Sequence, residues 1–219
     1  MTISKMYWLY FLGIPKTIYF NLKYFPILIA IKFPIFISHN VLLNKCKGKI
    51  EIIGKITTGM IKIGYGDVPI FDRYKSRTVW NVQGKIIFNG ICNIGHGSKI
   101  GVGGMLTIGN NFSITAESII LCDNDIKFGE NVLISWNCQI MDTDFHSIYI
   151  DEVQQDPIGK INIGNTNWIC SNVQILKNTQ FGDNNVVAAG SILNKNYNCS
   201  NSLIAGIPAK ILSNNISWK

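Results

Sequence analysis

A bulky apolar residue returns every six positions toward the C-terminal end of this chain. The series is Ile163, Ile169, Ile175, Phe181, Val187 and Leu193. Earlier stretches have the same period: Phe88, Ile94, Ile100 and Leu106; Ile108, Ile114, Ile120 and Ile126; Phe128, Ile134 and Ile140. A period of six matches neither a strand nor a helix. It predicts short strands joined by turns, three to a coil, with one aliphatic residue per face in a narrow core, which is a hexapeptide β-helix.

The irregularities of the repeat also favour a solenoid. The spacing widens to eight between Ile100 and Ile108, so that coil has about 20 residues, as expected where extra residues enter at corners. The position four after each aliphatic residue should be small and face inward. Ser98, Gly104, Ser118, Cys138, Val173, Thr179 and Ser191 satisfy this, whereas Phe112, Asn124, Asn167 and Asn185 do not.

The pattern divides the chain into three parts. Residues 1–45 are expected to form a basic, aromatic, partly helical cap or arm, and residues 46–212 the β-helix. The repeat fails over 141–160, which predicts a loop inserted between coils, and residues 213–219 form a C-terminal tail.

The positive charge is concentrated at the N-terminus. Residues 1–50 contain seven lysines and no acidic residue, while the rest is balanced. Recurring lysines and prolines keep apolar runs below the roughly 20 residues of a membrane span, and they do not fit a cleaved signal peptide. Two interpretations remain: a cap on the open end of the coil or on a neighbouring subunit, and a peripheral contact with anionic lipid. Lysine without arginine argues against nucleic-acid binding.

The six cysteines form no CxxC pair and have no metal-ligand spacing, which favours reduced thiols in a cytoplasmic protein, either free or peripheral at the inner face of the plasma membrane. No metal is expected, because Asp142, Asp144 and His146 alone cannot complete a tetrahedral site. His39 and His96 add no ligand spacing, and the glycines around His96 predict an exposed corner histidine.

His146 is the candidate general base. It occupies the position where the next aliphatic residue after Ile140 would fall. In an extended segment Asp142, Asp144 and His146 would alternate onto one side. A carboxylate on one imidazole nitrogen leaves the other free to accept a proton, and the sequence does not decide which aspartate pairs with it.

The C-terminal half resembles a known family. The runs W-I-C-S-N-V-Q-I-L, F-G-D-N-N-V-V-A-A-G-S-I-L-N-K and L-I-A-G-I-P-A-K-I-L are similar to hexapeptide-repeat acetyltransferases, most of all to O-acetyltransferases of bacterial capsule and lipopolysaccharide sugars. The resemblance covers roughly residues 88–212. It implies a left-handed parallel β-helix, a homotrimer with active sites between subunits, acetyl-CoA as the donor and a small-molecule or glycan acceptor.

The resemblance also implies roles for individual residues. His146 matches the catalytic histidine. Matches to the family's coenzyme A contacts are Trp168 and Ser171 at the pantetheine arm, Ala189 at its amide, and Asn194, Lys195 and Lys210 near the nucleotide. The chain departs from the family at Cys170, where glycine is usual, and at Asn194, where threonine is usual.

Three functions follow as alternatives. The first is acetyl transfer from acetyl-CoA to a sugar hydroxyl, by direct attack in a ternary complex, in surface polysaccharide biosynthesis. The second is N-acetylation of an amino sugar nucleotide on the same scaffold. The third is a non-catalytic binding solenoid, in which His146 has no chemical task.

Overall fold

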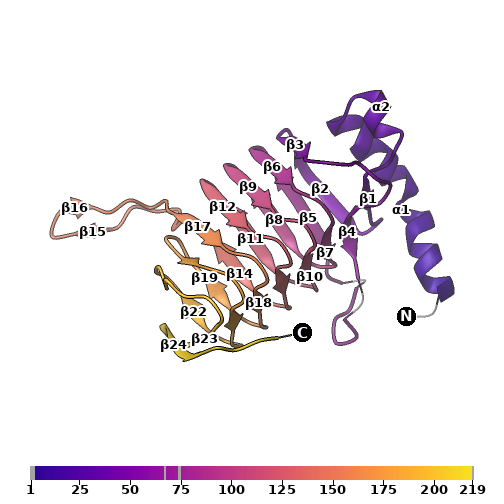
Figure 1. Ribbon diagram of the computed structural model, residues 1–219. Helices are drawn as coiled ribbons and strands as arrows, with labels where there is room; N and C mark the ends of the chain where they lie inside the picture. Colours follow the sequence, from indigo (N-terminus) through magenta and orange to yellow (C-terminus); the bar gives the residue numbers. More distant parts are fainter. Residues whose placement is uncertain (1–2, 67, 74, 219) are drawn as a thin grey trace.

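Three parallel sheets wind around one narrow apolar core. The computed structural model describes residues 3–66, 68–73 and 75–218. Each coil adds one strand to each sheet, so hydrogen-bonded neighbours are a whole coil apart in sequence, except in the antiparallel hairpin of residues 202–214 (Figure 1). The chain is a left-handed parallel β-helix with a helical N-terminal cap and a long loop between two coils, which confirms the predicted fold class.

The sheets are named A, B and C in the order in which each coil visits them. Sheet A contains β1 (Ile35–Ile37), β4 (Ile61–Tyr65), β7 (Cys92–Gly95), β10 (Phe112–Ile114), β13 (Leu133–Ile134), β18 (Trp168–Ile169), β21 (Val186–Val187), β23 (Ser202–Gly206) and β24 (Ala209–Asn214). Sheet B contains β2 (Val41–Cys46), β5 (Thr78–Val82), β8 (Lys99–Val102), β11 (Ile119–Cys122), β14 (Gln139–Met141), β19 (Gln174–Ile175) and β22 (Ile192–Leu193). Sheet C contains β3 (Lys49–Ile52), β6 (Lys85–Phe88), β9 (Met105–Ile108), β12 (Asp125–Phe128), β17 (Lys160–Ile163) and β20 (Gln180–Phe181).

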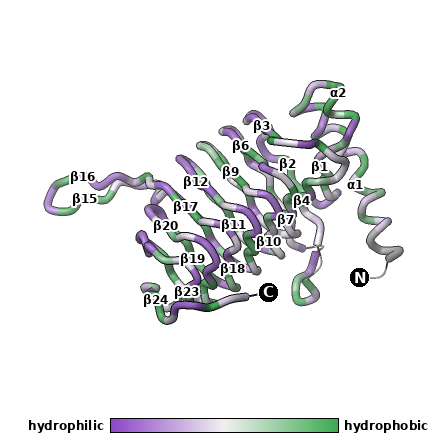
Figure 2. The backbone as a smooth tube through the Cα atoms, viewed as in Figure 1, coloured by the Kyte–Doolittle hydropathy of each residue, from purple (hydrophilic) through white to green (hydrophobic). Residues whose placement is uncertain are grey.

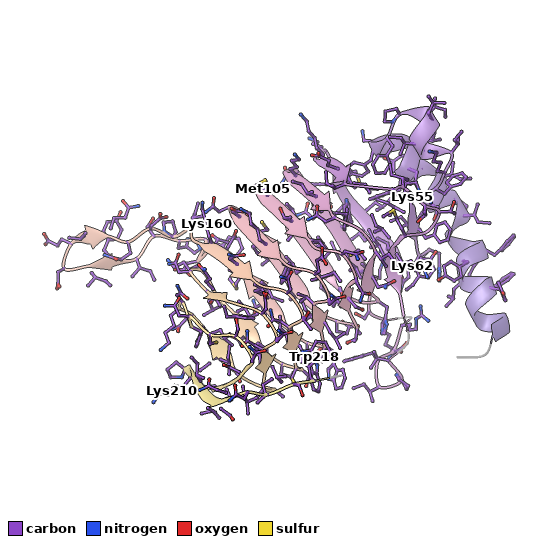
Figure 3. The ribbon with its side chains drawn as sticks, in the orientation of Figure 1. Lys55, Lys62, Met105, Lys160, Lys210 and Trp218 are labelled. Atoms are coloured by element: carbon purple, nitrogen blue, oxygen red, sulfur yellow. The ribbon has the colours of Figure 1, made fainter. Side chains whose placement is uncertain are left out.

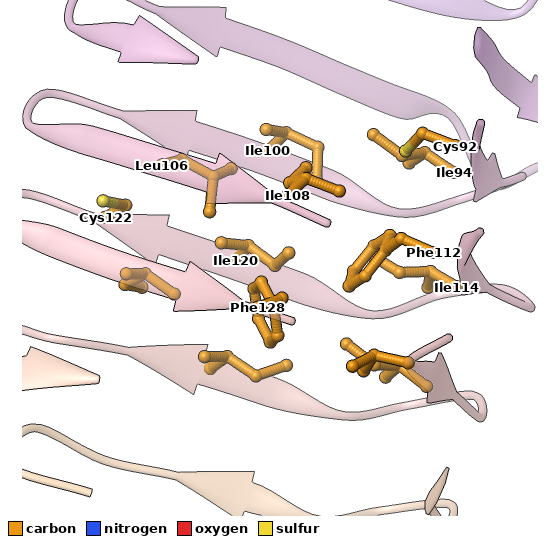
Figure 4. Packing of buried hydrophobic residues seen from close by; sticks show 14 of the residues in the cluster. Cys92, Ile94, Ile100, Leu106, Ile108, Phe112, Ile114, Ile120, Cys122 and Phe128 are labelled. Atoms are coloured by element: carbon orange, nitrogen blue, oxygen red, sulfur yellow. The ribbon is translucent and has the colours of Figure 1, made fainter. Parts of the chain in front are cut away.

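The six-residue repeat produces stacks of side chains in the core. The parallel register pairs Ile94 with Ile114 in sheet A and Ile100 with Ile120 in sheet B, and all four are buried (Figure 4). Each side chain therefore packs between equivalent residues of the coils before and after it. Apolar and polar stretches alternate along the coils, because successive strand residues point in and out (Figure 2).

The corners require special backbone conformations. Asn111, Asn131 and Asn184, all between sheets C and A, have φ angles of 56°, 55° and 58°. Asparagine tolerates this left-handed region better than most residues. At the same corner a Cβ on Gly109 would lie 2.1 Å from the carbonyl oxygen of Gly129, so only glycine allows the two coils to approach.

Two of the inward positions that are not small form a polar column. Asn167 and Asn185 are fully buried. The backbone N–H of Asn185 donates to Asn167 Oδ1 at 2.7 Å, and the N–H of Ser202 donates to Asn185 Oδ1 at 3.0 Å. These bonds satisfy the buried amides, so large polar residues are accommodated where small ones were expected.

The N-terminal cap consists of α1 (Ile3–Tyr24) and α2 (Ile27–Ala30) and covers the first coil. Within the described residues, no helix combines the length and the hydropathy required to cross a membrane. Strands begin at Ile35, since β1 and β2 pair in parallel with β4 and β5. The first coil therefore includes the C-terminal part of the segment assigned to the cap from sequence.

Candidate functional site

The inserted loop leaves the coil after β14 and returns at β17. It occupies the corner between sheets B and C and carries a short antiparallel hairpin, β15 (Tyr149–Ile150) and β16 (Val153–Gln154), which projects from the body (Figure 1). Despite the insertion, β17 resumes the register of β12, so Lys160 pairs with Asp125. The loop is an addition to an otherwise continuous solenoid.

Asp142 holds the base of this loop. Its carboxylate is fully buried and accepts the backbone N–H groups of Asp123 at 2.7 Å and Asn124 at 2.9 Å. Its backbone carbonyl accepts the N–H of Gly159 at 2.8 Å, where the chain returns. Both oxygens of the carboxylate are thus engaged by the preceding coil.

Asp144 lies on the outer side of the loop base. Its carboxylate forms an ion pair with Lys177 Nζ at 2.7 Å, and its N–H donates to the carbonyl of Pro157 at 2.8 Å. Lys177 was not identified from the sequence. The repeat contained a signal for it. Ile140 pairs with Ile175, so Lys177, two residues past Ile175, lies in the coil next to Asp142, two residues past Ile140.

His146 is exposed on the same loop. Its backbone N–H donates to the carbonyl of Asp144 at 2.7 Å, and Phe145 between them has a φ of 61°. Within the part of the chain that the structure describes, its imidazole has no hydrogen bond or ion pair. The expected alternation of both aspartates and the histidine onto one side is wrong, because the segment turns at Phe145 instead of remaining extended.

Trp168 begins β18 and faces outward from sheet A. Its indole Nε1 donates to Ser135 Oγ at 3.1 Å, and its ring packs against Trp218 with centroids 6.0 Å apart. Trp218 in turn donates from Nε1 to the carbonyl of Thr166 at 2.9 Å. The C-terminal tail therefore packs on the outer face of the coil that carries Trp168, which the sequence did not indicate.

Ser171 and Ala189 occupy equivalent places in adjacent coils. Both lie two residues past paired residues of sheet A, at the corner between sheets A and B. The N–H of Gly190 donates to the carbonyl of Ser171 at 3.0 Å, and Ala189 is exposed. The structure thus brings these two candidates together on one edge.

The remaining candidates lie in the last coil and on the final strand. Asn194 and Lys195 are exposed at the corner between sheets B and C, the same edge as the inserted loop. Lys195 Nζ lies 5.6 Å from the centroid of the Tyr197 ring. Lys210 is exposed on β24 (Figure 3). Within one chain, the candidates at corners therefore form two groups on different edges of the prism, while Trp168 and Lys210 lie on strands of sheet A.

His96 does not fit its expected place. It lies at the corner between sheets A and B but is only 3% exposed, and its ring is 6.1 Å from that of Phe71. The prediction of an exposed corner histidine is wrong because the segment carrying Phe71 packs over this corner.

The six cysteines are free, and burial raises the pKa of each thiol, that of Cys138 to about 11. A thiol held protonated is a poor nucleophile. Among the described residues, no three histidine, cysteine, aspartate or glutamate side chains are grouped to hold a metal ion.

Known proteins resemble this chain over part of its length. No protein-family model matches it. An uncharacterised 24.8 kDa protein in the cps region of Klebsiella pneumoniae is 33% identical over 111 residues, 50% of this chain and 49% of that protein. Galactoside O-acetyltransferase of Escherichia coli is 34% identical over 115 residues, 50% of this chain and 54% of that protein. The chain thus spans about half the length of these curated relatives.

A solved structure extends the similarity of fold. The polySia-specific acetyltransferase NeuO superposes with a TM-score of 0.52 at 20% identity, over 84% of this chain and 74% of that one. At this identity the likeness concerns the fold alone. Together the comparisons confirm the resemblance to hexapeptide-repeat O-acetyltransferases that the sequence motifs indicated.

Proposed function

We propose that this chain, similar to hexapeptide-repeat O-acetyltransferases, transfers an acetyl group from acetyl-CoA to a hydroxyl of a sugar in a bacterial surface polysaccharide. The 34% identity to galactoside O-acetyltransferase supports the reaction class. The similarity to a protein in a cps region supports the kind of acceptor. The observation that carries the proposal is the exposed imidazole of His146 on a loop whose base is fastened to the coil by Asp142 and Asp144.

In this proposal His146 is the general base. Its neutral imidazole accepts the proton of the acceptor hydroxyl as that oxygen bonds to the thioester carbonyl carbon. The tetrahedral intermediate then expels the sulfur of coenzyme A, and the imidazolium returns a proton to the thiolate. The products are the acetyl ester and free coenzyme A, and the histidine ends neutral.

Direct transfer is favoured over a covalent acetyl-enzyme on cysteine. A thiol nucleophile must reach its thiolate form, and burial raises the pKa of all six thiols here. Donor and acceptor would therefore be bound together. Ser171, Ala189, Trp168, Asn194, Lys195 and Lys210 are proposed to hold coenzyme A, with the lysine cations near its phosphates.

The proposed active form is a homotrimer. His146 and Lys195 lie at the corner between sheets B and C, whereas Ser171 and Ala189 lie at the corner between sheets A and B. Packing one edge against the other edge of a neighbour would complete a cleft that a single chain cannot form. Light scattering is expected to give the mass of three chains, and a monomer that retains full activity would contradict this arrangement.

The experiment for the function is direct. The purified chain is incubated with acetyl-CoA and a panel of sugars and oligosaccharides, and the acetylated position is located by mass spectrometry. The proposal expects a new ester on oxygen together with equimolar release of coenzyme A. An acetyl group on nitrogen, or no transfer to any acceptor, would contradict it.

A further inference from the structure

The helix α1 turns polar groups toward the protein body. Thr17 Oγ1 accepts the N–H of Ile37 at 3.0 Å, and Asn21 exchanges two hydrogen bonds with the backbone of Ile35. Lys16 Nζ donates to the carbonyls of His39 and Val41. These side chains provide hydrogen-bond partners for backbone groups of the first coil. Among them are groups of β1, which lies at the open edge of sheet A and would otherwise leave them unpaired.

The inward side of α1 also buries Phe20 against Trp80, but further apolar residues of the helix face outward. Trp8, Phe11, Ile14, Ile18 and Leu22 recur at helical spacing and are exposed, with Trp8 at 60% and Phe11 at 61%. The next helix continues the exposed apolar surface with Ile27 and Leu28, and Ile31 follows directly after it. An exposed apolar surface of this extent marks a contact with a partner or a membrane.

A groove opens beside this apolar side. It has a volume of about 460 Å³ and lies between α1 and the start of sheet A, with walls formed chiefly by Tyr10, Phe11, Ile14, Ile18, Phe33 and Phe36. Tyr10 stacks on Tyr65 with ring centroids 4.5 Å apart, which holds this part of α1 to the coil. The space suits a hydrocarbon chain, because its lining offers contacts to apolar groups.

The charges around the helices distinguish between the possible partners of this apolar surface. Residues 1–50 contain seven lysines and no acidic residue, and Lys23 and Lys32 are exposed on the cap. A second copy would place lysines against lysines without carboxylates to neutralise them. An anionic lipid surface neutralises them, and tryptophan and tyrosine favour the boundary between headgroups and hydrocarbon.

We propose that α1 and α2 form a docking surface for an anionic lipid bilayer. The apolar side of α1 lies in the headgroup region, Lys23 and Lys32 contact anionic headgroups, and the groove receives a hydrocarbon chain of the bilayer. With 22 residues, α1 is about 33 Å long and lies along the surface rather than across it. The active β-helix is thereby held next to the membrane face.

Vesicle flotation of the full chain tests this proposal. The vesicles are phosphatidylcholine alone, or phosphatidylcholine with phosphatidylglycerol. The chain should float with the anionic vesicles at low salt, bind the neutral ones at least tenfold more weakly, and dissociate from the anionic ones as salt increases. Absence of binding to anionic vesicles would overturn the proposal. No acetyl donor is present, so this result is separate from that for acetyl transfer.

Matched variants locate the surface. Phe11→Asp should weaken binding to anionic vesicles at least tenfold, whereas Leu212→Asp should bind like the parent, because Leu212 is equally exposed (64%) on the last strand of sheet A. Circular dichroism checks that both variants are folded. Equal loss in the two variants would overturn the proposal. So would a fall in particle mass on Phe11→Asp, which would show that a second copy covers this side.

Discussion

The carboxylate of Asp144 lies 2.7 Å from Nζ of Lys177, and this ion pair joins the inserted loop to the following coil. Asp144 is two residues before His146, whose backbone N–H it accepts. The pair therefore sets where the candidate base stands relative to the rigid prism. Since both side chains are partly exposed, its contribution to global stability is small.

Lys177→Met is expected to lower the rate of acetyl transfer with little effect on the stability of the fold. The free energy of unfolding should change by less than about 1 kcal/mol. By contrast, kcat/KM for acetyl transfer should fall roughly tenfold, because a loop freed from Lys177 places His146 less accurately. Lys177→Arg should restore most of the rate. Steady-state kinetics and thermal unfolding of the three proteins provide the test, and equal rates for parent and Lys177→Met would refute the positioning role.

Asp142 should matter for folding more than for chemistry. Asp142→Ala leaves the part-buried N–H groups of Asp123 and Asn124 without their carboxylate, which should lower the free energy of unfolding by about 1–3 kcal/mol in total. Glu130→Ala, at an exposed corner, serves as the control and should change stability by less than about 0.5 kcal/mol. Denaturant unfolding measures both; similar values for the two variants would show that the buried carboxylate is not needed.

The stacking of side chains in the core predicts a large loss of stability when one of them is truncated. Ile120 is fully buried between Ile100 and Ile140, so Ile120→Ala should lower the free energy of unfolding by about 2–5 kcal/mol. Ile91 is 50% exposed at a corner, and Ile91→Ala should cost well under half as much. The comparison is made by urea unfolding. A mild effect at Ile120 would mean that the coils are not packed in this register.

His39 should make stability depend on pH. Burial, together with the charges of Lys16 and Arg73, lowers the pKa of His39 from its usual 6.5. The unfolded chain then binds a proton at a pH where the folded chain does not, so acidification favours unfolding. The stability is present above about pH 6.5 and is lost as the pH falls through the folded pKa. Tm should fall as the pH is lowered from about 7.5 to about 5, and the slope of Tm against pH should be shallower in His39→Asn. Identical slopes in the two proteins would exclude His39 as the source of the pH dependence.

The fold could be predicted because its cause is local and repeated. Each hexapeptide needs one aliphatic residue for the core and a turn-forming residue for the corner, as with Ile114 in sheet A and Asn111 before it. The β-helix and the position of the inserted loop follow from counting. The start of the first coil at Ile35 does not, because β1 depends on α1 to cover its edge.

The site was less predictable because its contacts cross between coils. The sequence places Asp142 and Asp144 near His146. In the structure, however, Asp142 accepts hydrogen bonds from backbone N–H groups, and Asp144 forms an ion pair with Lys177, more than 30 residues away. The packing of Trp218 on Trp168 likewise joins the tail to a coil 50 residues earlier. Spacing along the chain carries no information on such partners unless the register of the coils is applied first.

The role of His146 as the base is tested by comparing the parent with His146→Ala. Both are given acetyl-CoA and an acceptor sugar, and release of free coenzyme A is followed with a thiol reagent. Loss of the general base should lower kcat roughly 10²- to 10⁴-fold while the KM for acetyl-CoA stays close to that of the parent. Release of coenzyme A at the parental rate by His146→Ala, dependent on the acceptor, would contradict the assignment of His146 as the base.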